Sequence, residues 1–207
     1  VGTDSRGDVL TSPAAFAGAV LTGGASRRMG RDKALLVVDG RPLAVTVAAV
    51  LDEAGATDVV AVGGDAAGLA DVGLKAVPDG HPGEGPLGGI LTALYHFAPS
   101  VLPVVVMACD LPAANPGNVI AAVDAVAGAD PAVGVPLVDG RRQWMHACWT
   151  PGARPLLAAE FARGERAAWR AAEGAVTCGL SILEVTGPWP RGFSDVDQPG
   201  DLGTSGQ

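Results

Sequence analysis

The stretch that decides the fold reads Leu21-Thr22-Gly23-Gly24-Ala25-Ser26-Arg27-Arg28-Met29-Gly30-Arg31-Asp32-Lys33. It follows an apolar run, Phe16 to Val20, whose length and flanking turn residues predict a short buried strand. The loop should therefore leave the carboxyl end of a strand, where open α/β sheets bind ligands. Two adjacent glycines allow the backbone to approach a ligand closely, and four cations lie beside them: Arg27, Arg28, Arg31 and Lys33. The pattern favours a polyphosphate ligand, and a surface turn with solvated basic side chains is the alternative.

This stretch matches neither of two common phosphate-binding motifs. In a P-loop the lysine directly follows a glycine and precedes Ser or Thr, whereas Lys33 follows Asp32 and precedes Ala34. The glycine spacing also differs from the dinucleotide-binding pattern Gly-x-Gly-x-x-Gly.

Composition predicts one globular domain. The chain has 207 residues, of which 48% are hydrophobic and 17% charged, so it can bury a substantial core. Its formal net charge of -8 argues against a nucleic-acid partner and against an anionic membrane surface, both of which require a basic footprint. The cationic cluster of the opening loop is a local exception that suits a small anion.

The three cysteines and the chain ends carry little structural signal. Cys109, Cys148 and Cys178 are odd in number and lack Cys-x-x-Cys spacing, so neither a disulfide framework nor a zinc site is expected. Reduced thiols fit a cytoplasmic location. Residues 1–13 have no long apolar core and are interpreted as a flexible tail, as are residues 203–207, with the domain at 14–202.

Strand and helix patterns alternate along the chain. After the first strand, further strands are predicted at 58–62, 74–77, 101–108, 132–135 and 181–185, and helices at 43–54, up to about 97, 116–127, 151–161 and 164–172. Pro42 suits a first helical position and Asn115 an N-cap. Asp139-Gly140 predicts a hairpin, and 181–185 an edge strand. The alternation predicts a three-layer α/β/α, Rossmann-like fold with a mostly parallel central sheet and right-handed crossovers.

Two further segments follow strands and carry candidate functional groups. The first reads Pro78-Asp79-Gly80-His81-Pro82-Gly83-Glu84-Gly85-Pro86-Leu87-Gly88-Gly89-Ile90; taken alone, it is equally a mobile connection. The second is Cys109-Asp110, which ends the most strand-like run, 101–108. A carboxylate there needs a positive partner, which the opening loop and a magnesium ion could supply; capping the next turn is the alternative. Cys109 is interpreted as a small residue at the edge of the core.

Taken together, these motifs resemble those of a known family. The opening stretch resembles the signature loop of nucleotidyltransferases, and its Gly-Gly and Asp-Lys pairs are similar to those of the molybdenum cofactor guanylyltransferases. Gly85-Pro86-Leu87-Gly88-Gly89 resembles the element that these enzymes use beside the base and sugar, and Asp110 matches their metal-binding aspartate. The segment 193–202, which contains Asp195-Val196-Asp197, resembles their closing motif. The resemblance covers residues 16–202.

The resemblance implies both an activity and a set of site residues. The implied reaction transfers GMP from GTP to molybdopterin-bound molybdenum cofactor and releases pyrophosphate. Lys33 and Arg28 would offset charge on the leaving pyrophosphate, and Asp110 and Asp197 would hold Mg²⁺ between the phosphates. The implied nucleotide contacts are Leu21, Thr22, Gly23, Gly24, Lys33, Asp79, Gly85, Pro86, Leu87, Gly88 and Asp110.

The acceptor half departs from the family pattern. A hairpin borders the acceptor pocket in the guanylyltransferases, and the strand after it commonly carries a proline, where this chain has Trp144-Met145-His146. Trp144 either stacks on a pterin or belongs to the core, and His146 is interpreted as structural. His81 is expected to be an exposed loop residue. The arginines near a family-like Gly-Glu-Arg element either bind an acceptor phosphate or form a solvated helix face: Arg163, Arg166 and Arg170.

Several alternatives stay open at this point. The aspartates of the closing motif also fit a cytidylyltransferase or an enzyme with another phosphorylated acceptor. A nucleotide-binding regulatory protein without turnover is the alternative from a different class. A small acceptor can be handed between proteins, so transient contact with cofactor-delivery or acceptor proteins is also open.

Overall fold

A mostly parallel sheet forms the centre of the structure, a computed structural model that describes residues 14–23, 32–111 and 114–187. Within these residues its main strands follow the order β10-β7-β9-β6-β1-β4-β5, and β8 pairs with β7. The strands that run parallel to one another are β1 (Ala17–Leu21), β4 (Val59–Val62), β5 (Ala76–Val77), β6 (Val104–Ala108), β7 (Ala132–Val138) and β10 (Ser181–Val185). Among the described strands of this sheet, only β9 (His146–Trp149), between β6 and β7, and β8 (Arg141–Arg142) run antiparallel to the others.

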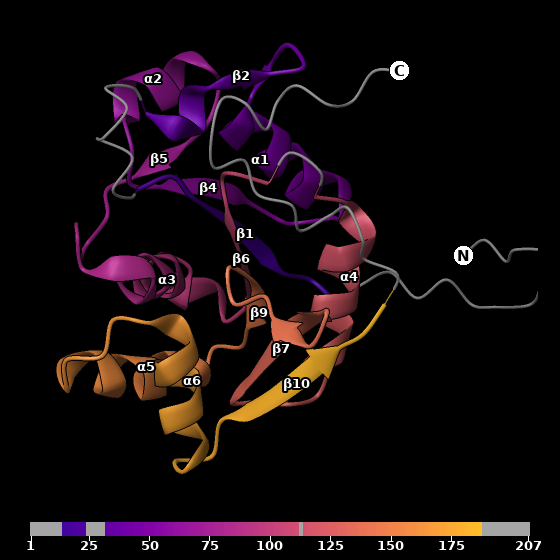
Figure 1. Cartoon of the computed structure of the whole chain (residues 1–207), viewed down its shortest axis with the longest axis vertical. Helices are drawn as coiled ribbons and strands as arrows, with labels where there is room; N and C mark the ends of the chain where they lie inside the picture. The colour runs from indigo at the N-terminus through magenta and orange to yellow at the C-terminus, as the bar shows by residue number, and fades with distance from the viewer. Residues whose placement is uncertain (1–13, 24–31, 112–113, 188–207) are drawn as a thin grey trace, which may run out of the picture.

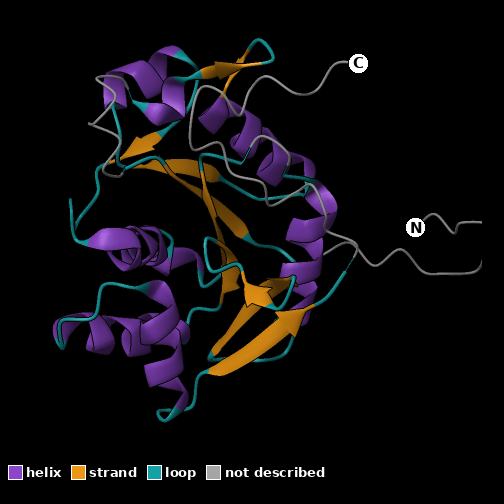
Figure 2. Cartoon of the chain, viewed as in Figure 1, coloured by secondary structure: helices purple, strands orange, loops and turns teal. Residues whose placement is uncertain are grey.

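Helices cover both faces of this sheet (Figures 1 and 2). One face carries α3 (Gly85–His96), α5 (Ala153–Ala162) and α6 (Ala168–Val176), and the other carries α1 (Leu43–Glu53) and α4 (Pro116–Ala125). The short α2 (Ala66–Asp71) lies beside β5. The expected three-layer α/β/α fold is therefore confirmed.

The two layers of core follow from the alternation of side chains along each strand. In β1, Ala17, Ala19 and Leu21 face α3, whereas Val20 belongs to the core on the side of α1. Residues of β6 divide in the same way, and both strands are buried along nearly all of their length. Such burial on both faces explains why the sequence shows continuous apolar runs at these strands.

The structure confirms most predicted elements and corrects some of their limits. The predicted strand at 101–108 begins only at Val104, because Val101 is 71% exposed and left-handed, with a φ of 57°, after the 3₁₀ turn Ala98–Ser100. Pro42 is not in the first helical turn: it ends the hairpin of β2 (Val37–Val38) and β3 (Arg41–Pro42) and precedes α1. Helix α2 is an addition to the predicted set.

The structure confirms the predicted hairpin turn, the predicted helix N-cap and the predicted edge strand. Asp139 and Gly140 both have positive φ, 49° and 73°, and they join β7 to β8 in the predicted hairpin. Asn115 caps α4 by accepting the N–H of Asn118 at 3.1 Å. β10 is the edge strand, as predicted. None of the described helices combines the length and apolar character needed to cross a lipid bilayer.

Candidate active site

The opening loop is tied to the neighbouring strand directly after β1. The N–H groups of Thr22 and Gly23 both donate to the carbonyl of Val62, at 3.0 and 3.1 Å. The Thr22 hydroxyl lies 3.0 Å from the same carbonyl and 2.9 Å from that of Gly63. The side chain of Leu21 belongs to the core. These two loop amides are therefore bound within the protein, and Gly24 and Arg28, like Arg27 and Arg31, lie outside the described residues.

Two glycines after β4 make this close packing possible. Gly63 has a φ of +78°, and a Cβ atom there would lie 2.9 Å from the Cα of Gly23. Gly64 has a φ of +73°, and its Cβ would lie 2.9 Å from the hydroxyl oxygen of Thr22. Sequence reasoning gave these residues no role, and the signal that could have found them is a Gly-Gly pair directly after a strand.

A lysine from the first loop meets the aspartate of the central strand. Lys33 Nζ lies 2.9 Å from Asp110 Oδ2, and the two side chains are 19% and 25% exposed. Asp32 places this lysine, because its Oδ1 accepts the N–H of Ala34 and caps the 3₁₀ turn Lys33–Leu35, while its Oδ2 accepts the N–H of Asp65 at 2.8 Å. The fold thus brings together two predicted catalytic residues that lie 77 positions apart.

The Asp110 carboxylate suits a hard divalent cation. Mg²⁺ commonly binds one or two carboxylates together with substrate phosphates and keeps several waters. Within the part of the chain that the structure describes, no group of three or more His, Cys, Asp or Glu side chains forms a closed metal site. A magnesium ion that also binds substrate phosphates needs no more than one or two carboxylates from the protein, and Asp110 supplies one. Asp197, the second expected ligand, lies outside the described residues.

Asp79 in the second glycine-rich loop is held in a defined orientation. Its Oδ1 accepts the N–H of His81 at 2.9 Å and lies 3.1 Å from the hydroxyl of Thr92. Its Oδ2 faces the first loop, 3.7 Å from the place where a Cβ of Gly23 would stand. The fold therefore brings Asp79 and Gly23, two predicted nucleotide contacts, to one place.

The Gly-Pro-Leu-Gly element opens α3, and its residues differ in how accessible they are. Gly85 and Pro86 are exposed, whereas Leu87 and Gly88 are buried. The Leu87 side chain is fully buried in the core, and its N–H donates to the carbonyl of Arg166 at 3.2 Å. Both groups are engaged within the protein, and the nucleotide contact at Leu87 stays a prediction.

The tryptophan of the acceptor half lies at the border between the core and the surface, and its stacking on a pterin stays a prediction. Trp144 packs partly on the core, with its ring centroid 6.2 Å from that of Trp149. It also lines a groove of about 610 Å³ together with Leu137, Gly140, Arg141, Arg142, Trp169, Glu173 and Glu184. In this groove Arg142 pairs with Glu184 at 2.7 Å and with Glu173 at 3.3 Å. The groove thus offers indole rings and balanced charge.

The titratable groups beside Asp110 are not set up for nucleophilic catalysis. Burial raises the pKa of the Cys109 thiol to about 12, with the Asp110 charge acting in the same direction. Burial lowers the pKa of His146 to about 4, so the imidazole is neutral at physiological pH. Both residues agree with the structural roles expected for them.

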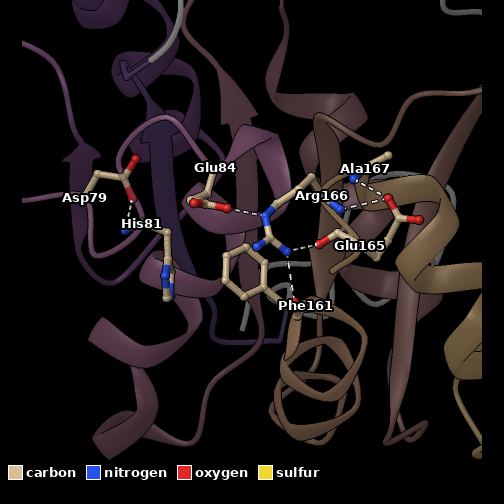
Figure 3. Close-up of polar contacts among 7 residues, drawn as sticks. All are labelled: Asp79, His81, Glu84, Phe161, Glu165, Arg166 and Ala167. Atoms are coloured by element: carbon tan, nitrogen blue, oxygen red, sulfur yellow. Dashed lines mark hydrogen bonds and ion pairs between the residues drawn. The ribbon is translucent and has the colours of Figure 1, made fainter. Parts of the chain in front are cut away.

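The three arginines near α6 all have acidic partners. Arg163 pairs with Glu160, and Arg170 lies 3.2 Å from Glu165. Arg166 donates to Glu84, in the second glycine-rich loop (Figure 3). His81, expected to be exposed, is partly buried and packs on the ring of Phe161, with 4.6 Å between the centroids.

Solved structures with the same architecture define the class of the fold. The molybdopterin-guanine dinucleotide biosynthesis protein A from Archaeoglobus fulgidus superposes with a TM-score of 0.65 at 24% identity, covering 90% of this chain and 95% of that one. The 2-C-methyl-D-erythritol 4-phosphate cytidylyltransferase from Thermus thermophilus superposes with a TM-score of 0.62 at 18% identity, covering 89% and 94%. The chain has a nucleotidyltransferase fold.

The chain belongs to the MobA-like NTP transferase family, whose domain profile matches residues 18–176. The molybdenum cofactor guanylyltransferase of Rhodobacter capsulatus is 34% identical over 190 residues, which cover 90% of this chain and 93% of that protein. The molybdenum cofactor guanylyltransferase of Xanthomonas euvesicatoria is 42% identical over 105 residues, which cover 50% of this chain and 51% of that protein. The matched region thus spans about half the length of some curated relatives and nearly the whole length of others.

Proposed function

We propose that the protein is a molybdenum cofactor guanylyltransferase that transfers GMP from GTP to molybdopterin-bound molybdenum cofactor and releases pyrophosphate. The observation that carries this proposal is the Lys33–Asp110 pair at the carboxyl edge of the central strands, in a chain related over most of its length to the Rhodobacter guanylyltransferase. The pair combines a cation for phosphates with a carboxylate for a metal ion.

The reaction needs no protein nucleophile. An oxygen of the acceptor's terminal phosphate forms a bond to the α-phosphorus of GTP, and the bond from that phosphorus to the β-phosphate oxygen breaks. The acceptor phosphate is already ionised, so no group has to remove a proton from it. This agrees with a protonated Cys109 and a neutral His146 beside the site.

In this proposal the protein contributes positioning and charge. Lys33 stabilises the negative charge that develops on the leaving pyrophosphate, and Arg28 is proposed to assist it. Asp110 and Asp197 are the carboxylates that would hold Mg²⁺, which neutralises phosphate oxygens when bound. Asp79 is proposed to contact the nucleoside by accepting a hydrogen bond. The main chain of the two loops is proposed to lie against the nucleotide at Leu21, Thr22, Gly23, Gly24, Gly85, Pro86, Leu87 and Gly88.

The groove beside Trp144 is proposed to receive the acceptor. Its indoles offer flat apolar faces for a pterin ring. Arg142 is paired with two glutamates in the groove, so Arg141, which is exposed, is the better candidate for an acceptor phosphate. Delivery of the acceptor by a transiently bound protein, and a cytoplasmic location, stay predictions.

Two measurements test the function. Thermal shift with GTP, CTP, ATP and UTP in the presence of magnesium should show the largest stabilisation with GTP. Mass spectrometry after incubation with GTP and molybdopterin should then detect the guanine dinucleotide product. A larger shift and a product with CTP would instead support a cytidylyltransferase, and GTP binding without product would indicate a regulatory protein.

A further inference from the structure

The side chain of Arg166 joins two segments that lie far apart in the sequence. Its Nε donates to the carboxylate of Glu84, which directly precedes α3. Its Nη1 donates to the main-chain carbonyls of Phe161 and Glu165, at 2.9 and 2.8 Å (Figure 3). Its Nε and Nη1 groups are therefore committed to acceptors of the protein itself.

An aromatic contact extends the same connection. The Cζ atom of Arg166 lies 4.0 Å from the centroid of the Phe161 ring, and the ring of His81 packs on Phe161 as well. His81 in turn donates its backbone N–H to Asp79 (Figure 3). The contacts lead from Arg166 to the carboxylate proposed to bind the nucleoside.

The main chain of Arg166 contacts the same loop. Its carbonyl accepts the N–H of Leu87 at 3.2 Å, in the first turn of α3. A Cβ atom at Gly85, which has a φ of +78°, would lie 3.1 Å from this carbonyl oxygen. Backbone and side chain of one residue thus hold Glu84, Gly85 and Leu87 against the α5–α6 connection.

Arg166 is itself anchored. The Glu165 carboxylate accepts the N–H groups of Arg166 and Ala167, each at 2.8 Å, and these bonds lower the pKa of Glu165. The pair of Arg166 and Glu84 is 39% and 48% exposed, and ion pairs of this kind add little to global stability. The geometry therefore supports a role of Arg166 in orienting loop 79–88 better than a role in global stability.

We propose that Arg166 is a positioning residue for the nucleotide-binding loop 79–88, and not a ligand of the acceptor phosphate. The inference rests on the proposed function, because that function makes this loop contact the nucleotide. Without the guanidinium, the loop samples other conformations, and the apparent affinity falls by the fraction of molecules that keep the competent one.

The test compares Arg166→Met with Arg154→Met. Methionine keeps an aliphatic stem over Phe161 but removes every side-chain donor. Arg154 is a matched control, since it lies on α5 with its Cζ 5.5 Å from the ring of Tyr95 on α3, outside the loop. Dissociation constants for magnesium nucleotide, KM and kcat are measured, with hydrogen exchange of the amides in 80–88.

We expect Arg166→Met to raise the dissociation constant and the KM for GTP about tenfold, as when the competent loop population falls to about a tenth. The kcat at saturating GTP should stay within about twofold of the wild-type value, because the reacting groups are unchanged. Hydrogen exchange in 80–88 should become faster. Glu84→Leu should behave alike, whereas Glu84→Gln, which keeps an acceptor oxygen, should stay near wild type, as should Arg154→Met.

Unchanged nucleotide affinity and unchanged exchange in Arg166→Met would overturn the inference, as would a rise in KM for the acceptor alone. The nucleotide dissociation constant and the hydrogen exchange of 80–88 are measured without the acceptor, so they test the role of Arg166 independently of the transfer reaction. If the wild type binds a nucleoside triphosphate but forms no dinucleotide, the proposed transfer fails, and the affinities for that nucleotide still decide the role of Arg166.

Discussion

Replacing Asp110 by asparagine separates catalysis from folding at the centre of the site. Two unit charges at the 2.9 Å between Lys33 and Asp110 attract by about 6 kcal/mol at an effective dielectric constant of about 20. Desolvation and partial exposure cancel most of this, so the net loss in folding free energy should be about 1 kcal/mol. In a chain of this length such a loss lowers Tm by about 2–4 °C.

The loss in activity should be much larger. A carboxylate that holds a metal ion at the phosphates acts mainly in the transition state, and its removal should slow GMP transfer about a thousandfold, or about 4 kcal/mol. Pyrophosphate release gives the rate, and thermal denaturation gives Tm. Asp124→Asn, at an exposed position of α4, is the control and should match the wild type in both.

Either of two results would refute this reasoning. A wild-type rate in Asp110→Asn would show that the carboxylate is not required for the chemistry. A fall in Tm of more than about 10 °C would show instead that the pair with Lys33 mainly maintains the fold.

Further predictions concern the glycine contact, one histidine and the thiols. Gly63→Ala should lower the free energy of unfolding by about 1–3 kcal/mol and weaken GTP binding, because its Cβ would meet Gly23. Gly128→Ala, at a φ of +77° with open space around it, should lower the free energy of unfolding by about 1 kcal/mol and leave GTP binding unchanged. Equal effects of the two variants in urea unfolding and in binding calorimetry would contradict this prediction. Burial lowers the pKa of His146 from 6.5 to about 4, so between these pH values the unfolded chain binds more protons than the folded one. The free energy of unfolding should therefore fall by about 3 kcal/mol in total as the pH drops from above 6.5 to below 4. This decrease should be smaller in His146→Gln, and an identical pH profile of stability in the variant would contradict the prediction. Ellman's reagent at pH 8 should react quickly with the exposed Cys178 alone, and the two buried thiols should react only after denaturation; rapid reaction of more than one thiol would be inconsistent with the burial.

Local patterns made much of this protein predictable. The apolar run before the opening loop, the Asp139-Gly140 turn and the Asn115 cap each depend on neighbouring residues, and all three appear in the structure. The same local information failed at Val101, whose β-branched side chain suggested a strand. It is exposed in a left-handed turn because the sheet, through pairing of β6 with β1, begins only at Val104.

The sequence by itself determined the class of fold and the candidate loops, because hydrophobic periodicity and turn residues are encoded over a few positions. Only the tertiary structure decided which groups meet: Lys33 with Asp110, Gly63 with Gly23, and Arg166 with Glu84. It also showed that the Leu87 side chain is buried in the core and that its N–H is bonded to Arg166. These pairings depend on strand order and helix placement, which bring together residues that lie from 40 to more than 80 positions apart.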